Sequence, residues 1–308
     1  MLIARALEAV TPTGDLILAC HCRAATPGPA DPRLCMKLMR RGLEEHHFAR
    51  RHVTLDEDAY LILNGCEPGG STYRGEDGAW PFVVFIGSDS VAQCLSTASP
   101  GDEGHGNARC RFGFLEHLRP HGDGVSQRLQ LIARHVEAGL DDALWYEEQL
   151  VDLLHAALLC EGELQQASLR IASVKAATRQ ELLRRVLLAT DFICSHYEQP
   201  ITLDDIAAAA SLSRFHLVRL FRQVHGVTPH AHLLAKRMTV AERLLAQTRL
   251  DINEIAVRAG FGTRWSLFRQ LRKRRGAGGE ALRQRLEREW TEVRHVPPAS
   301  PTPCLTSA

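Results

Sequence analysis

The feature that most constrains this chain of 308 residues is an internal repeat near its C-terminus. The segment LDDIAAAASL at 203–212 aligns with INEIAVRAGF at 252–261, 49 residues further on. After one inserted residue, LVRLF at 217–221 aligns with LFRQL at 267–271. Each copy predicts a short helix, a tight turn at a small residue and a second helix. We therefore expect two helix-turn-helix units, at about 203–225 and 252–275.

The residue types in both copies suit this geometry. A small residue on the first helix lets the second helix cross at close range, a small residue fits the constrained turn, and a polar residue can cap the first helix. The pairs at these places are Ala207 and Ala256, Ser211 and Gly260, and Thr202 and Asp251. Leu212 and Phe261 are expected to fill the core beneath each turn. A generic helical bundle would not repeat this set of choices.

The second helix of each unit separates apolar from basic residues. Leu217 with Phe221, and Leu267 with Leu271, are expected to point inward. The opposite faces carry six arginines: Arg214, Arg219, Arg222, Arg264, Arg269 and Arg272. Arginine suits both bidentate contact with guanine and contact with phosphate, so these faces are candidate DNA-reading surfaces.

A helix boundary lies between the two units. Gly226 closes one helix, Thr228 caps the next, and Pro229 occupies its first position. The apolar helix that follows, from Leu233 to Leu245, is long enough to connect the two units.

The N-terminal part has a different pattern. The runs at 53–63 and 81–86 are rich in β-branched and aromatic residues, and glycine, proline and asparagine separate them. We expect a small β-barrel or sandwich there. Apolar residues then recur at helical spacing and predict helices at about 126–140 and 143–161, followed by a partly helical connector at 162–177. Thr178 and Glu181 have the spacing of a capping box and predict the start of the next helix.

Charge is distributed unevenly along the chain, although the formal net charge is only +1. Residues 1–180 contain 17 Lys and Arg against 24 Asp and Glu, whereas residues 181–290 contain 19 against 11. An excess of positive charge in one segment is expected when that segment alone meets nucleic acid. The alternative is a chance difference between solvated faces.

The C-terminal pattern resembles the AraC/XylS family of transcription regulators over about residues 185–285. The resemblance rests on Leu203, Ile206-Ala207, Leu212-Ser213, His216-Leu217, Arg219-Leu-Phe221, Gly226-Val-Thr228-Pro229, Arg237, Ala241, Leu244-Leu245, Ile255-Ala256 and Gly260-Phe261. The chain departs from the family at Leu267 and Leu271, where phenylalanine is common, and at Gly276–Gly279, where the family has a glycine-x-x-proline element.

The resemblance implies an α+β chain in four parts: a β-rich, cupin-like effector domain at 1–125, a helical dimerisation segment at 126–177 and an all-α DNA-binding domain of two helix-turn-helix units at 178–290. The fourth part, 291–308, is rich in proline, serine and threonine and is expected to be a disordered tail.

By motif position, the resemblance also implies base-contacting residues. In the first unit these are Phe215, Val218 and Arg219, with Arg214 close by, and in the second they are Arg264, Trp265, Ser266 and Arg269. Val218 can make only apolar contact, for example with a thymine methyl group. Trp265 could stack on sugar or a thymine methyl group, or be partly buried in the core.

We therefore expect a sequence-specific transcription regulator that acts as an activator, is not an enzyme and places its two recognition helices in adjacent major grooves of promoter DNA. Its expected partners are double-stranded promoter DNA, a second copy of the chain, RNA polymerase and a small-molecule effector. We expect no cofactor and no membrane span, and a cytoplasmic, nucleoid-associated location.

Two alternatives concern the N-terminal part. Cys20-His21-Cys22 is dense enough to suggest a metal or redox sensor, although a fourth ligand has no definable spacing, or a cysteine that accepts alkyl groups from DNA. Glu44-Glu-His-His47 could suggest a metal site, but this segment precedes the expected strands and is better explained as solvated charges.

Overall fold

The structure is a computed structural model that describes residues 3–22, 34–48, 51–65, 70–75, 77–98, 113–172 and 175–275. The chain divides into two compact units. The first contains residues 1–196 and 201–232, and the second contains residues 197–200 and those from 233 onward. Within the described ranges, no helix is both long and apolar enough to cross a membrane.

Antiparallel strands make up two sheets in the first unit. The six-stranded sheet has the order β1-β2-β8-β3-β6-β9, and the three-stranded sheet has the order β5-β4-β7. The strands are β1 (Ile3–Val10), β2 (Leu16–Cys22), β3 (Leu34–Arg41), β4 (Leu43–His47), β5 (His52–Leu55), β6 (Ala59–Leu63), β7 (Ser71–Arg74), β8 (Trp80–Ile86) and β9 (Leu118–Pro120).

Helices account for most of the chain after residue 123. They are α1 (Ser88–Ala98), α2 (Gly124–Glu137), α3 (Ala143–Leu169), α4 (Ala176–Ser195), α5 (Leu203–Ala209), α6 (Arg214–His225), α7 (Pro229–Gln247), α8 (Ile252–Arg258) and α9 (Arg264–Arg275). The expected α+β organisation, with a β-rich N-terminal region followed by a helical C-terminal region, is confirmed.

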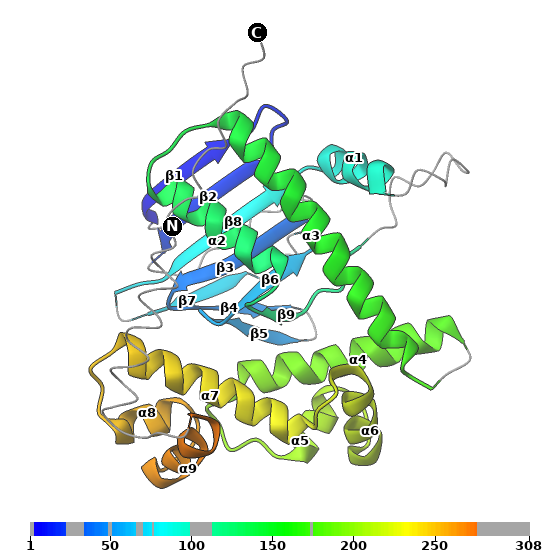
Figure 1. The fold of residues 1–308 in the computed structure, drawn as a ribbon, viewed down its shortest axis with the longest axis vertical. Coiled ribbons are helices and arrows are strands. Elements are labelled where there is room, and N and C mark those ends of the chain that lie inside the picture. The colour runs from blue at the N-terminus through cyan, green and yellow to red at the C-terminus, as the bar shows by residue number, and fades with distance from the viewer. Residues whose placement is uncertain are drawn as a thin grey trace. The chain divides into compact units, whose positions relative to one another are not determined.

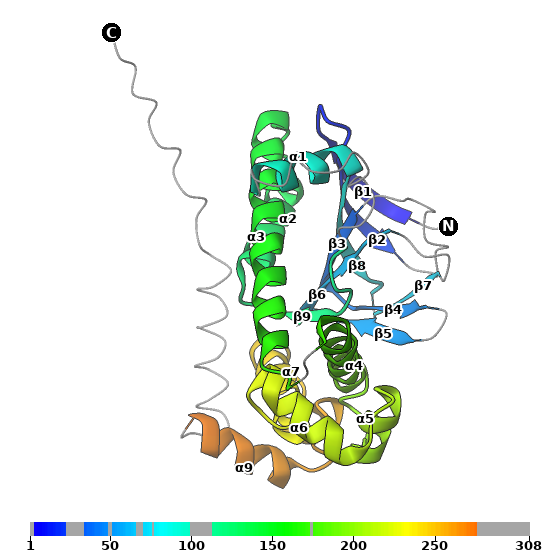
Figure 2. The ribbon, with the colours of Figure 1, turned by 90° about the vertical axis from the view of Figure 1, so that its right-hand side faces the viewer.

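One hydrophobic core lies between the six-stranded sheet and helices α2 and α3, which cover one face of that sheet (Figures 1 and 2). Phe82, Val84 and Ile86 of β8 face this core, because successive side chains of a strand point to opposite faces. Leu129 of α2 and Leu153 of α3 pack against them and are fully buried. The stripe of apolar residues predicted for these helices therefore covers the sheet.

A second core lies on the other face of the six-stranded sheet. Val83 and Phe85 of β8 face it, together with Val53 and Leu55 of β5 in the three-stranded sheet. All four side chains are buried. The runs predicted at 53–63 and 81–86 thus contribute side chains to both cores, and along β8 these side chains alternate between the two faces of the sheet.

The prediction of solvated charges at Glu44–His47 is wrong for Glu44 and His46, which the alternation of β4 turns inward. Glu44 is fully buried and His46 is 6% exposed. Lys37 Nζ of β3 donates to Glu44 Oε1 at 2.8 Å, and His46 Nε2 lies 3.3 Å from the same oxygen. Burial alone would raise the pKa of Glu44, but Lys37 and His46 hold it well below its usual range. Among the described residues, Glu44 Oε2 has no hydrogen-bond partner.

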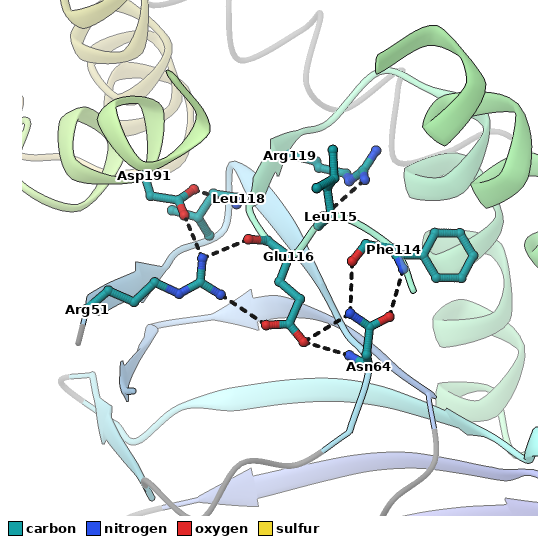
Figure 3. A network of polar contacts seen from close by, with 8 residues as sticks. All are labelled: Arg51, Asn64, Phe114, Leu115, Glu116, Leu118, Arg119 and Asp191. Carbon is teal, nitrogen blue, oxygen red and sulfur yellow. Dashed lines mark hydrogen bonds and ion pairs between the residues drawn. The ribbon is translucent and has the colours of Figure 1, made fainter. Parts of the chain in front are cut away.

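A polar network joins Arg51, which precedes β5, to β9 and α4 (Figure 3). The Arg51 guanidinium donates to the backbone oxygen of Glu116 at 2.7 Å and lies 3.3 Å from Asp191 Oδ2. Asp191 Oδ1 accepts from the backbone N–H of Leu118 at 2.8 Å, and Asn64 contacts the Glu116 carboxylate. Asp191 is buried, and this burial raises its pKa to about 7, although the Leu118 N–H and Arg51 act in the opposite direction.

Helix α4 also contacts the first helix pair, α5 and α6. Arg185 donates to the backbone oxygen of Ser211 at 3.0 Å, and Thr190 Oγ1 lies 2.9 Å from His225 Nε2. Helix α4 therefore has contacts with the sheets through Asp191 and with the first helix pair through Arg185 and Thr190.

The second unit is built around the part of α7 that follows residue 232, with α8 and α9. Its core contains nine buried residues: Met238, Val240, Ala241, Leu245, Ile255, Ala256, Ala259, Leu267 and Leu271. Arg237 of α7 donates to the backbone oxygens of Tyr197 and Gln199, both at 2.7 Å. These bonds attach the short segment 197–200 to α7.

Three local predictions between residues 126 and 181 need correction. Helix α2 ends at Glu137 instead of about 140, and α3 continues past 161 to Leu169, so the connector predicted at 162–177 is partly helical, as expected. The capping box predicted at Thr178 is not formed, because α4 begins at Ala176 with Lys175 as an N-cap that makes no side-chain bond. Glu181 instead pairs with Arg185 at 2.8 Å, one helical turn later.

The domain limits predicted at 125, 177 and 290 stay predictions. The glycine-rich segment at 276–279, where the sequence departs from the family pattern, and the predicted tail at 291–308 lie outside the described residues.

Candidate nucleic-acid interface

The first helix pair begins with a complete capping box. Thr202 accepts the backbone N–H of Asp205 through its hydroxyl, and the Asp205 carboxylate accepts the N–H of Thr202 at 2.7 Å. Ala207 is 4% exposed where α5 meets its partner helix. The turn then contains Ser211 at φ 51°, and Ser213 caps α6. The predicted N-cap and turn are both confirmed.

Helix α6 has one buried and one exposed face. Leu217, Leu220, Phe221 and Val224 form the buried face. Phe215 is 77% exposed, although phenylalanine is among the residue types most often buried. The other residues predicted to read DNA here are the exposed Arg214, Arg219 and Arg222 and the half-buried Val218.

Arg214 forms an ion pair with Asp204 of α5. Its Nε lies 2.7 Å from Asp204 Oδ1, and both side chains are about two-thirds exposed, at 66% and 64%. Exposed pairs of this kind contribute about 0–1 kcal/mol, so a phosphate can replace Asp204 at little cost.

The second helix pair repeats the arrangement with a different turn. Asp251 accepts the N–H of Asn253 at 2.8 Å and caps α8, and Ala256 is fully buried. The turn contains Gly260 at φ 76° and Gly262 at φ 70°. Glycine adopts these angles without the strain that a side chain would bring. The predicted cap and turn glycine are confirmed.

Helix α9 buries Leu267 and Leu271 as predicted, so the leucines that replace the phenylalanines of the resemblance still fill the core. The prediction that Leu212 and Phe261 fill the core beneath each turn holds in part, since both are half-buried. Of the residues predicted to read DNA, Arg264, Trp265, Arg269 and Arg272 are exposed and Ser266 is half-buried.

Trp265 is 72% exposed, so the alternative of partial core burial is wrong. The Arg264 guanidinium lies 5.4 Å from the centre of the Trp265 ring, within the range of a cation–π contact. An exposed indole next to an arginine offers a flat apolar surface and a positive charge together.

The last turn of α9 adds basic residues that the sequence interpretation did not include. Lys273 is exposed beside Arg272. Arg275 differs, because Glu242 of α7 receives it in a paired contact with two distances of 3.1 Å. Arg274 Nε also lies 3.7 Å from Glu242 Oε1. The run of four basic residues was visible in the sequence, but only the structure shows which of them pair with Glu242.

The N-terminal candidate Cys20-His21-Cys22 is split by strand alternation. The two sulfur atoms lie 3.6 Å apart, whereas His21 Nε2 lies 2.7 Å from the backbone oxygen of Asp77 and its ring stacks on Trp80. The hydrogen bond from Cys20 lowers the pKa of Cys22, and the same contact, with burial, raises that of Cys20. Because Cys22 is only 4% exposed, a bulky substrate such as alkylated DNA has little access to its sulfur.

Comparisons with known proteins agree with the helix pairs. A family profile described as "Helix-turn-helix domain" matches residues 206–285. The chain is 25% identical over 147 residues to the probable transcriptional regulator LumQ of Photobacterium leiognathi, covering 48% of this chain and 54% of LumQ. It is 36% identical over 73 residues to the lactose operon transcription activator of Staphylococcus xylosus, covering 24% and 26%.

Among solved structures, the C-terminal domain of the response regulator AraT from Geobacillus stearothermophilus is 30% identical, covering 33% of this chain and 84% of that one, with a TM-score of 0.32. The chain spans about half of the length of LumQ and about a quarter of the length of the lactose operon activator. The matched segment of this chain, residues 206–285, is a helix-turn-helix domain of the AraC type.

Proposed function

We propose that this protein is a sequence-specific transcription regulator that binds double-stranded promoter DNA through α6 and α9. The observation that carries the proposal is the exposed face of α6, where Phe215 and the three arginines project from a helix whose opposite face is buried. A helix with this division can enter a major groove while its apolar face stays in the protein core. Helix α9 repeats the division with Trp265 and its arginines.

The roles of the side chains follow from their chemistry. Arg219 and Arg269 are the proposed base readers, because arginine can donate two hydrogen bonds to guanine. Arg222 and Arg272, one turn later on each helix, are proposed to contact phosphate. Phe215 and Trp265 offer apolar surfaces for sugar or a thymine methyl group, and the two helices are proposed to enter adjacent major grooves.

The test begins with genome-wide mapping of bound DNA, which supplies a site for equilibrium binding measurements. Arg219→Ala and Arg269→Ala are each expected to cost about 1–3 kcal/mol of specific binding, roughly fivefold to 150-fold in affinity. The matched control is Arg41→Ala, which removes an exposed arginine of β3, a strand outside both helix pairs. Arg41 forms an exposed ion pair with Asp77. Wild-type affinity in both helix variants would refute the assignment of the readers, and no preference for any duplex would refute the function.

We propose that the protein acts as an activator and contacts RNA polymerase. The support is the similarity of its C-terminal segment to a lactose operon transcription activator. Transcription in vitro from the mapped promoter tests this proposal, since an activator raises the amount of transcript and a repressor lowers it.

We propose that the N-terminal region senses a small-molecule effector and forms a homodimer. The buried carboxylate of Glu44 supports the first role, because its unpartnered Oε2 can accept a hydrogen bond from a ligand in the core between the sheets. A row of exposed apolar residues on α3 supports the second: Leu144, Val151 and Leu159 are 66%, 49% and 73% exposed and recur at helical spacing.

A further inference from the structure

The β4–β5 hairpin has a second polar face, opposite the buried Glu44 and His46. Glu45 and His47 are two residues apart on β4, so both side chains point away from the core. His52, the first residue of β5, stands directly opposite His47 in the register of the two strands. Sheet geometry therefore brings one carboxylate and two imidazoles to the same place.

The distances between these groups are short. One ligand atom each from Glu45, His47 and His52 can be chosen so that all three lie within 4.8 Å of one another. The ring centres of His47 and His52 are 4.8 Å apart. The Glu45 side chain is 16% exposed, His52 is half-buried and His47 is exposed, so an ion in solution can reach all three.

The donor set selects a class of ion. Two imidazole nitrogens and one carboxylate oxygen are ligands for divalent transition metals, and Zn²⁺ binds both groups at about 2.0–2.2 Å. Ca²⁺ and Mg²⁺ prefer sites made of oxygen alone. Three protein ligands leave a fourth position of a tetrahedral site for water.

We propose that Glu45, His47 and His52 form a binding site for a divalent transition-metal ion of the Zn²⁺ type on the outer face of the β4–β5 hairpin. The site differs from the buried Lys37–Glu44–His46 cluster and from the Cys20–Cys22 pair, and it goes beyond the proposed binding of DNA.

One neighbour competes with the ion. Arg74 of β7 lies 3.0 Å from Glu45 Oε2, and its side chain is 66% exposed. Because the Arg74 side chain is largely in water, solvent screens this ion pair, and a metal ion can compete with Arg74 for the carboxylate. This competition predicts that Arg74→Ala strengthens metal binding, because the substitution frees the Glu45 carboxylate and removes a positive charge. If the three residues had only a structural role, the substitution would not create tighter binding of a metal ion.

His196, the residue that follows α4, lies beside the site. Its ring centre is 6.4 Å from that of His52, and its Nδ1 lies 3.0 Å from the backbone oxygen of Phe192. Donation from Nδ1 to this carbonyl leaves the lone pair on Nε2, the tautomer found in metal-binding histidines. Thr54 of β5 also donates its N–H to Ser195 Oγ at 2.9 Å, so the hairpin and the end of α4 are already in contact.

The test uses the full chain without an affinity tag, stripped with a chelator and titrated with ZnCl₂ in a calorimeter, with native mass spectrometry for the stoichiometry. We expect one Zn²⁺ per chain at this site. His47→Ala and His52→Ala should each weaken binding at least about tenfold, and Arg74→Ala should tighten it. The matched control is His155→Ala, since His155 is an exposed histidine on α3. Far-ultraviolet circular dichroism checks that each variant is folded.

The cysteine pair is the competing site. With Co²⁺ in place of Zn²⁺, the spectrum should lack a thiolate-to-metal charge-transfer band, and binding should persist in the double variant Cys20→Ser with Cys22→Ser. The proposal is overturned if the chain binds no Zn²⁺, if affinity survives the loss of both His47 and His52, or if the cysteine variant abolishes binding.

Discussion

The residue with positive φ that follows the first helix is serine in the first helix-turn-helix turn and glycine in the second, and this difference predicts different effects of substitution on stability. Gly260 in the second turn has φ 76° and Ser211 in the first has φ 51°. A Cβ atom at position 260 would overlap the backbone oxygen of Tyr197 and lie 2.8 Å from Arg237 Nε. That oxygen accepts a hydrogen bond from Arg237 at 2.7 Å, so it cannot move away without losing this bond.

The magnitude for Gly260→Ala follows from two contributions. Placing a side chain in the left-handed region costs about 1–2 kcal/mol. Overpacking against fixed neighbours costs about 1–3 kcal/mol more. We therefore expect Gly260→Ala to lower the local free energy of unfolding of α8 and α9 by roughly 3 kcal/mol.

Gly262 provides the matched control, because it has φ 70° and no atom within 4 Å of its hypothetical Cβ. Gly262→Ala should cost only the backbone contribution, about 1–2 kcal/mol, partly offset by the smaller entropy of the unfolded chain. Ser211→Gly should change the first turn in the opposite direction, with a gain of about 1 kcal/mol.

Hydrogen exchange read by mass spectrometry measures these changes, because it reports opening of 252–275 separately from the rest of the chain. Equal losses for Gly260→Ala and Gly262→Ala would refute the role of the Tyr197 carbonyl. A stabilising effect of either variant would refute the argument from φ.

Three further predictions concern the first unit. Because burial raises the pKa of Asp191 from 3.8 to about 7, the folded chain keeps a proton that the unfolded chain releases. The stability that this proton contributes is complete below pH 3.8 and is lost as the pH rises through about 7. Between pH 5 and pH 8, the free energy of unfolding measured in urea should therefore fall less for Asp191→Asn than for the wild type. An equal or larger loss in the variant would contradict the raised pKa. Thr202→Ala removes half of a capping box and should weaken α5 by about 1 kcal/mol in hydrogen exchange, whereas Thr239→Ala on α7 should leave α5 unchanged. The double variant Leu144→Glu with Leu159→Glu should convert a dimer to a monomer in sedimentation equilibrium, whereas the control Val10→Glu, at an exposed apolar residue of β1, should stay dimeric. A dimer in both variants would exclude the exposed row on α3 as the dimer interface.

The helix pairs could be predicted because their signals are local. Thr202 and Asp251 cap helices through atoms two or three residues away, and Pro229 begins a helix because of its own ring. The repeat at an offset of 49 residues then supports each copy with the other. The capping box predicted at Thr178 shows the limit of such signals. It is not formed, because α4 starts before Thr178 and Glu181 pairs with Arg185 instead.

The polar faces of β4 could not be predicted, because both faces of this strand carry charged or titratable residues. The segment Glu44–His47 contains no apolar residue, so no alternation shows which side chains are buried. The partner that compensates the burial of Glu44 is Lys37, on a different strand. The site of Glu45 and His47 depends in the same way on His52, which the register of β4 and β5 places opposite.

Helix α4 is the element through which the proposed metal site can affect the first helix pair. Its last turn contacts the hairpin through Ser195, and its middle contacts the turn and α6 through Arg185 and Thr190. If the ion stiffens the hairpin, the amides of α4 should exchange more slowly when Zn²⁺ is added, with the largest effect in the last turn. The same measurement on His52→Ala should show no change. Protection of β4 and β5 with unchanged exchange in α4 would instead show that the ion acts only on the hairpin, and it would exclude α4 as the connection to the recognition helix.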